Sequence, residues 1–124
     1  MPVTTLVRMS LKILHNPRCS KSREALALLE SRGLAREVVE YLETPLTLPE
    51  LQTLHRQLGA PVRAMVRDNE DDYRELNLAD ASLTDTQLLQ AVADRPKLLQ
   101  RAIVVQGDRA LIARPPELLN DWLK

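Results

Sequence analysis

Cys19 is the only cysteine among 124 residues, and the segment around it favours thiol chemistry. The sequence there reads "NPRCSKSR" (16–23), between a short apolar run and an amphipathic stretch. Only the thiolate is a good nucleophile, and a free thiol with a pKa of about 8.5 is mostly protonated at neutral pH. A helix that begins at Cys19 would stabilise the anion through its unpaired N–H groups and its dipole.

Basic residues on both sides of Cys19 act in the same direction. Arg18, Lys21 and Arg23 bring positive charge close to the thiol, which lowers its pKa. The same charges can bind a small oxyanion, so one loop could hold both nucleophile and substrate. The alternative is a structural cysteine that packs as a small hydrophobe, but segment 16–23 is too polar for a core. We therefore predict a reactive thiolate at Cys19.

Ser22 stands where a dithiol oxidoreductase would carry the second cysteine of a Cys-x-x-Cys motif. The chain has no other thiol, so it can form neither an internal disulfide nor a resolving pair. A covalent intermediate on Cys19 must therefore be discharged by an external thiol, such as glutathione, a glutaredoxin or another partner protein.

Hydrophobic spacing predicts two strands and two helices in the first half of the chain. The short runs "LKILH" (11–15) and "REVVEYL" (36–42) are typical of strands. "TLPELQTLHRQLG" (47–59) begins with capping-box spacing and ends at a glycine, as helices do. Between the two strands, one face of a further helix is formed by Ser22, Ala25, Leu26, Leu29 and Gly33.

The second half continues with short helical pieces within residues 60–83 and a helix over residues 84–94. Residues 102–113 form two apolar runs around Gly107-Asp108, which predicts a hairpin, and residues 115–123 form a last helix that begins with proline. The order β-α-β-α, helical insert, β-β-α predicts an α/β chain of the thioredoxin/glutaredoxin type. Its mixed sheet, flanked by helices, has a parallel first pair of strands and an antiparallel last pair.

Composition narrows the class of protein further. An apolar fraction of 44% supports one domain over residues 1–124, with residues 1–10 as a flexible extension. The formal net charge is zero, so no overall field draws the chain to nucleic acid. No apolar run reaches the roughly 20 residues that span a membrane. Two histidines and one cysteine at unrelated spacings do not make a metal site. We expect a cytoplasmic monomer.

The loop "HNPRCSKSR" resembles the active-site loop of the glutaredoxin-linked arsenate reductases, a thioredoxin-fold family with an inserted helical region. The resemblance extends from residue 11 to about 124 and is closest to the shorter, arsenate-reductase-like branch. It continues through "YLETP" (41–45), "LGAPVRAMVR" (58–67), "YRELNLAD" (73–80), "RAIVV" (101–105) and "ARPPELL" (113–119).

This resemblance implies that Cys19 attacks arsenate and that three arginines hold the anion, namely Arg67, Arg101 and Arg114. Planar guanidinium groups pair bidentately with oxyanions of this kind. Arg101 precedes a predicted strand and Arg114 follows the next one, so hairpin pairing would bring both to one end of the sheet. No cofactor is bound in the family, and external glutathione and glutaredoxin supply the reducing thiols.

The resemblance also assigns roles next to the cysteine. His15 and Ser22 match positions that are thought to keep the thiolate ionised, although His15 could equally be a polar residue at a strand end. Asn16 could orient the loop by side-chain hydrogen bonds, or could serve only as a turn former.

One departure from the family concerns the peptide bond before the third strand. The family has a cis-proline there, whereas this chain has alanine in Arg101-Ala102-Ile103. A cis bond before a residue other than proline costs about 2.5–4 kcal/mol. We therefore expect the Arg101–Ala102 bond to be trans and the loop to be rebuilt.

The residues are also compatible with two other functions. Cys19 could exchange with glutathione or with protein mixed disulfides, without any oxyanion. The chain could also be a non-enzymatic binding module like the Spx regulators, which bind RNA polymerase. Those regulators use a Cys-x-x-Cys redox switch that Ser22 removes here, so we rank this function last.

Overall fold

The computed structural model describes residues 11–123, which form two compact units. Among the described residues, the first unit comprises residues 11–41 together with residues 101–123, and the second comprises Leu42–Gln100. The expectation of a single domain stays a prediction, and the expected N-terminal extension (1–10) lies outside the described residues.

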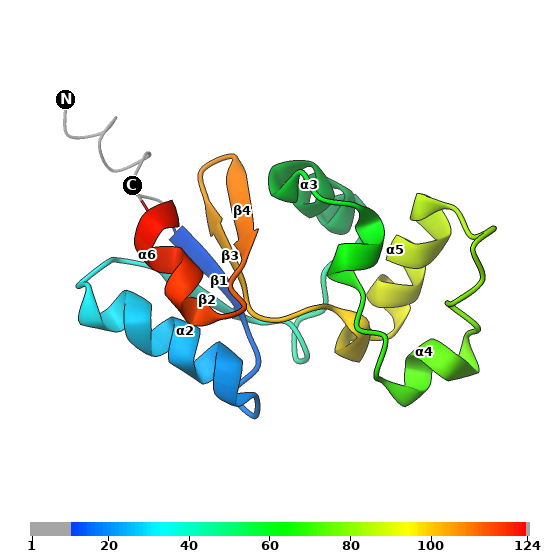
Figure 1. Cartoon of the computed structure of the whole chain (residues 1–124), viewed down its shortest axis with the longest axis horizontal. Coiled ribbons are helices and arrows are strands. Elements are labelled where there is room, and N and C mark those ends of the chain that lie inside the picture. The colour runs from blue at the N-terminus through cyan, green and yellow to red at the C-terminus, as the bar shows by residue number, and fades with distance from the viewer. Residues whose placement is uncertain (1–10, 124) are drawn as a thin grey trace. The chain divides into compact units, whose positions relative to one another are not determined.

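A four-stranded sheet forms the centre of the first unit (Figure 1). Its strands lie in the order β2 (Glu37–Glu40), β1 (Leu11–His15), β3 (Ile103–Gln106) and β4 (Arg109–Ile112). β1 and β2 are parallel, whereas β1 with β3 and β3 with β4 are antiparallel. The predicted mixed sheet of the thioredoxin/glutaredoxin type is confirmed. The second strand is shorter than its apolar run suggested.

Helices cover one face of this sheet. α2 (Ser20–Ser31) joins the two parallel strands, and the chain ends with the 3₁₀-helix η3 (Pro116–Leu118) and α6 (Leu119–Trp122). Alternate strand residues point to the same face of a sheet and therefore meet these helices together. The resulting core consists of Leu11, Ile13, Ala25, Leu29, Ala102, Val104, Ala113 and Leu119.

The predicted helix face of α2 is confirmed for Ser22, Ala25 and Leu29, which are buried, and for Leu26, which is partly buried against the core. Gly33 lies after the end of the helix and is exposed, so it does not belong to this face. The predicted hairpin is also present. It turns at Gly107, whose φ of +63° glycine adopts readily. The last helix differs in detail, since Pro116 opens a 3₁₀ turn and α-helical geometry begins only at Leu119.

The second unit is helical (Figure 1). It contains α3 (Leu48–Leu58), η1 (Val62–Met65), α4 (Asp71–Glu75), α5 (Asp85–Asp94) and η2 (Pro96–Leu98). The expected short helical pieces are thus η1 and α4. The sequence reading missed η2, because three residues are too few to produce a hydrophobic period.

Capping boxes begin both long helices of the second unit, as their sequences predict. The Thr47 hydroxyl accepts the Glu50 N–H, and the Glu50 carboxylate accepts the Thr47 N–H. Thr84 and Gln87 do the same for α5. Each box satisfies N–H groups that a helix end otherwise leaves unpaired.

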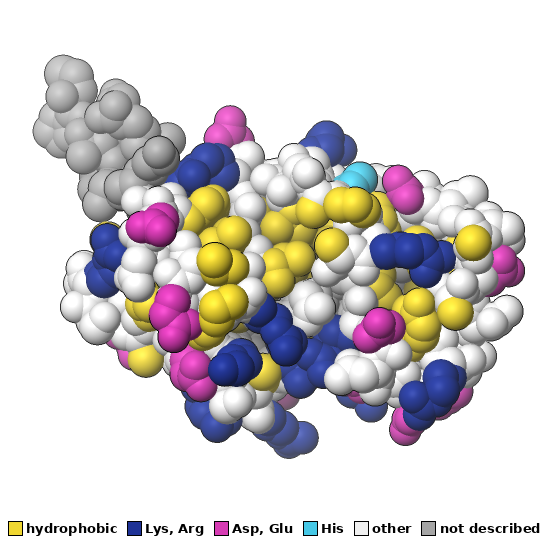
Figure 2. Space-filling view, viewed as in Figure 1, with side chains coloured by type: hydrophobic (Ala, Val, Ile, Leu, Met, Phe, Trp, Pro, Cys, Tyr) yellow, Lys and Arg dark blue, Asp and Glu magenta, His cyan; other side chains and the backbone are white. Residues whose placement is uncertain are grey.

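Charged side chains of both signs lie on the surface. Figure 2 shows basic (dark blue) and acidic (magenta) side chains on the visible face of each unit, in keeping with a formal net charge of zero. Of the helices within residues 11–123, none has the length and apolar character needed to cross a membrane.

We predict that Leu29→Ala lowers the free energy of unfolding by about 2–5 kcal/mol, because it leaves a cavity in a fully buried core. Leu28→Ala is the matched control, since Leu28 lies on the same helix and is only partly buried. Urea denaturation should show the smaller loss for Leu28→Ala. Equal losses would contradict the assignment of this core.

Candidate active site

Cys19 is the N-cap residue of α2, so its sulfur lies at the start of a helix, as predicted. Its backbone is extended (φ −99°, ψ 123°). Its N–H donates to the Asn16 carbonyl at 3.0 Å, and its own carbonyl accepts the Arg23 N–H at 3.0 Å. The first turn of α2 contains no acidic residue, so no carboxylate offsets the positive end of the helix dipole there.

The pKa of Cys19 is lower than that of an ordinary thiol, as the net result of opposing effects. Burial has the largest single effect and raises the pKa. The backbone N–H groups of Ser22 and Lys21 act against it, as do the charge of Arg101 and the hydrogen bond from its side chain. Together these groups outweigh burial. Because the thiolate is the nucleophilic form, the site favours attack by Cys19.

Side-chain hydrogen bonds hold the loop that precedes α2. The Asn16 side-chain oxygen accepts the Arg18 N–H at 3.0 Å, which is the local turn expected of asparagine. The Ser22 hydroxyl accepts the Asn16 N–H at 2.9 Å. Arg23 donates from Nη1 to the Pro17 carbonyl at 2.9 Å. The turn at residues 16–19 is thus tied to the first turn of α2 from both sides.

His15 is buried and lies beside Ser22, with its Nδ1 atom 2.7 Å from the Ser22 hydroxyl oxygen. Burial is the main cause that lowers the pKa of His15, and Arg23 adds to this effect. The carboxylates of Glu40 and Glu30 oppose it without reversing it. The imidazole is therefore neutral at neutral pH, and its ring is held by the same hydroxyl that anchors the loop.

The register of the sheet brings two of the predicted arginines to the end at which the loop leaves β1. Leu14 of β1 pairs with Ile103, and Ile103 pairs with Ile112. The end of β1 therefore lies next to the start of β3 and the end of β4, which Arg101 precedes and Arg114 follows. The expectation that hairpin pairing brings both arginines to one end is confirmed.

The peptide bond between Arg101 and Ala102 is cis, so the expectation of a trans bond was wrong. That expectation considered only the intrinsic preference of an isolated peptide. In the protein, Ala102 is fully buried in the core of the first unit, and its carbonyl accepts the Ala113 N–H at 2.7 Å. The bond between Arg114 and Pro115 is also cis.

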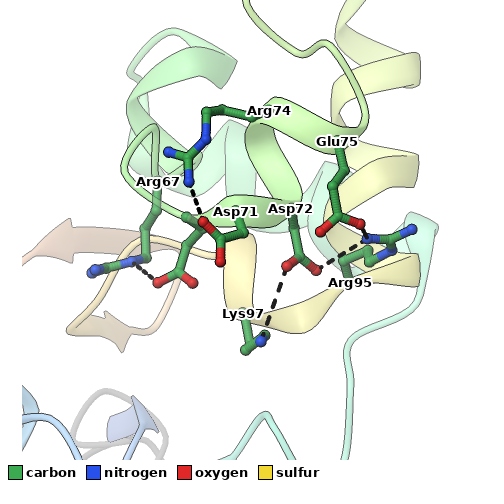
Figure 3. A network of polar contacts seen from close by, with 8 residues as sticks. Arg67, Asp71, Asp72, Arg74, Glu75, Arg95 and Lys97 are labelled. Carbon is green, nitrogen blue, oxygen red and sulfur yellow. Dashed lines mark hydrogen bonds and ion pairs between the residues drawn. The ribbon is translucent and has the colours of Figure 1, made fainter.

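Arg67 belongs to the second unit, between η1 and α4. Its N–H donates to the Leu98 carbonyl at 2.7 Å, next to an isolated bridge between Val66 and Leu99. Its side chain is only 8% exposed, and its Nε atom lies 3.2 Å from a carboxylate oxygen of Glu70 (Figure 3). The backbone of Arg67 is thus paired with the segment at Leu98, and its side chain is paired with Glu70.

The predicted residues are distributed over both units. The first unit contains the catalytic candidates Cys19, His15 and Ser22 together with Asn16, Arg101 and Arg114, and the second unit contains Arg67. Sequence reasoning missed the hydrogen bond from Arg101 to the sulfur and the contact from Arg23 to the loop. The spacing of Arg23, four residues after Cys19, was a signal for the latter, since residues four apart share a helix face.

No group of three or more His, Cys, Asp or Glu side chains that could hold a metal ion occurs within residues 11–123. The first unit offers a Cys19 thiolate beside the guanidinium of Arg101, which suits attack on an oxyanion or on a disulfide.

Comparison with known proteins gives consistent matches along the chain. The sequence model of the ArsC family matches residues 14–121 of this chain. The Escherichia coli K12 protein YfgD is 54% identical over 107 residues, which are 86% of this chain and 90% of YfgD. An arsenate reductase of Neisseria meningitidis serogroup A is 52% identical over 108 residues, 86% of this chain and 92% of that protein.

A solved structure agrees with these matches. The arsenate reductase from Vibrio cholerae superposes with a TM-score of 0.89 at 52% identity, over 93% of this chain and 98% of that one.

We predict that Arg101→Ala raises the pKa of Cys19, because it removes a positive charge and a hydrogen bond from the thiolate. Arg101→Lys should raise it less, since the charge is kept. Arg74→Ala is the control and should leave the pKa unchanged, because Arg74 is an exposed arginine of the second unit that pairs with Asp71. Ultraviolet absorbance of the thiolate during a pH titration measures all three variants. An unchanged pKa in Arg101→Ala would contradict this account of the sulfur.

We also predict that His15 titrates below 6.5, its ordinary value, because burial disfavours the charged ring. Between its folded pKa and 6.5 the unfolded chain binds more protons, so the free energy of unfolding falls as the pH falls through this window. Histidine ring resonances followed by NMR measure the titration. A His15 that titrates above 6.5 would contradict the neutral imidazole.

Proposed function

Because this chain belongs to the ArsC family, we propose that it reduces arsenate to arsenite, with Cys19 as the nucleophile and with glutathione and glutaredoxin as the source of electrons. The observation that carries the proposal is the lowered pKa of Cys19, which Arg101 and the first N–H groups of α2 produce together. A nucleophile and an anion-binding group thus meet in one place.

The first step is attack of the Cys19 thiolate on arsenic. A sulfur–arsenic bond forms, and one arsenate oxygen leaves as water once it has taken up protons. Arg67, Arg101 and Arg114 hold the remaining oxygens, because guanidinium groups present paired donors to such anions. Arg101 would thus stabilise the Cys19 thiolate before the attack. After the sulfur–arsenic bond has formed, the negative charge lies on the arsenate oxygens, and Arg101 would stabilise those.

The second step needs thiols from outside the chain, since Cys19 is its only cysteine. Glutathione attacks arsenic in the adduct and displaces a second oxygen as water. A glutaredoxin thiolate then attacks the glutathione sulfur, which forms a mixed disulfide and leaves the electron pair of the broken sulfur–arsenic bond on arsenic. Water finally displaces the Cys19 sulfur from arsenic(III) and releases arsenite. In sum, arsenic(V) gains two electrons and two thiols become one disulfide. The thiolate of Cys19 is regenerated for the next cycle.

His15, Ser22 and Asn16 support this chemistry as positioning residues. The Ser22 hydroxyl contacts both the imidazole of His15 and the N–H of Asn16, and its own N–H helps lower the pKa of Cys19. Loss of the Ser22 hydroxyl would loosen the loop without removing any group that touches the substrate.

Thiol–disulfide exchange is the second candidate, because a lowered thiol pKa favours attack on sulfur as well as on arsenic. The arginines distinguish the two reactions. Arsenate requires them as anion ligands, whereas exchange with a mixed disulfide does not. A glutathione adduct on Cys19 without turnover of arsenate would favour the exchange reaction. The cytoplasmic location and the monomeric state stay predictions.

We predict that Cys19→Ser abolishes arsenite production in an assay with arsenate, glutathione and glutaredoxin. Arg67→Ala, Arg101→Ala and Arg114→Ala should each raise KM for arsenate about tenfold to a hundredfold, as expected for loss of a hydrogen bond to a charged group. Arg74→Ala is the control, since Arg74 is an exposed arginine that pairs with Asp71. Full activity in all three arginine variants would show that the proposed cradle is wrong.

A further inference from the structure

The guanidinium of Arg67 has a single ion-pair partner in the part of the chain that the structure describes. Its Nε atom lies 3.2 Å from a carboxylate oxygen of Glu70, and only 8% of its side chain is exposed. Within residues 11–123, neither of its terminal nitrogens has a hydrogen bond. Figure 3 shows this contact at the edge of a larger polar network.

This pattern leaves one edge of the guanidinium for a ligand. Arginine has five N–H donors in a rigid plane, and the contact to Glu70 uses the one on Nε. The edge formed by the two terminal nitrogens matches two oxygens of a tetrahedral anion. An anion could therefore bind Arg67 while the contact to Glu70 stays in place.

Within residues 11–123, the one ion pair of the Glu70 side chain is with Arg67. Glu70 is the N-cap residue of α4, yet its side chain makes no capping hydrogen bond. Its carboxylate reaches back three residues to Arg67 instead, and it is only 22% exposed. The backbone of Glu70 accepts the Tyr73 N–H at 3.1 Å, a contact that a change of side chain leaves intact.

We propose that Glu70 is a positioning residue that orients the guanidinium of Arg67 for the oxyanion. The identity of the anion rests on the proposed function. An arginine that must be ordered on binding loses side-chain freedom at that moment, which weakens binding. Glu70 fixes the plane of Arg67 beforehand, so less of this cost remains when the anion arrives.

The first test observes Arg67 directly in the ligand-free protein. NMR of arginine side chains reports how fast the Nε proton of Arg67 exchanges with water. Glu70→Gln should keep the slow exchange, because an amide oxygen still accepts the hydrogen bond, whereas Glu70→Ala should accelerate it several-fold. Glu75→Ala is the matched control, since Glu75 pairs with Arg95 at the same distance of 3.2 Å. Unchanged exchange in Glu70→Ala would overturn the inference.

The second test measures the dissociation constant of arsenate by calorimetry with the full chain. Glu70→Ala should weaken binding about 3- to 10-fold, the effect of ordering one long side chain. Glu70→Gln and Glu75→Ala should bind as the wild type does. Tighter binding in Glu70→Ala would mean that Glu70 competes with the anion and would overturn the inference.

Arg67→Ala separates this inference from the proposed function. Weaker binding in Arg67→Ala with unchanged binding in Glu70→Ala would overturn the role of Glu70 and leave the arginine cradle in place. Unchanged binding in Arg67→Ala would overturn both.

Discussion

Stabilisation of the Cys19 thiolate at the start of α2 is the interaction on which the rest of the site depends. Burial opposes it, so the N–H groups of the first helical turn and the charge of Arg101 must together exceed that cost. The pairing of the strands places both the helical N–H groups and Arg101 near the sulfur. The parallel pair β1–β2 requires a connecting helix, and that helix begins where β1 ends. The antiparallel pairing of β1 with β3 brings Arg101 to the same end.

Much of this fold could be predicted because its signals are local. Alternation of apolar runs, capping-box spacing at Thr47 and Thr84, and a glycine at the hairpin turn each reflect contacts within a few residues. The sequence shows no comparable local pattern for the η2 turn or for the start of α6 at Leu119. The cis bond at Arg101–Ala102 was predicted wrongly, because contacts from residues distant in sequence, such as Ala113, surround it.

The candidate site shows the same division. Cys19 could be found from composition, since a lone thiol in a polar, basic segment is a poor core residue. The arginines could be selected from the thirteen in the chain only by resemblance to a family, because charge alone does not distinguish a ligand from a solvated side chain. The contacts of Arg101 with the sulfur and of Glu70 with Arg67 depend on side-chain placement. Such contacts require the structure.

The most direct test of the account is the rate at which Cys19 reacts with iodoacetamide at neutral pH, with and without arsenate. The account predicts faster alkylation than for an ordinary thiol, because the pKa of Cys19 is lowered and more of the thiol is ionised. It also predicts marked protection by arsenate, because the bound anion would lie next to the sulfur. Sulfate at the same ionic strength controls for screening by salt. Slow alkylation typical of an ordinary thiol, or alkylation that arsenate leaves unchanged, would contradict a thiolate that lies within an anion-binding site.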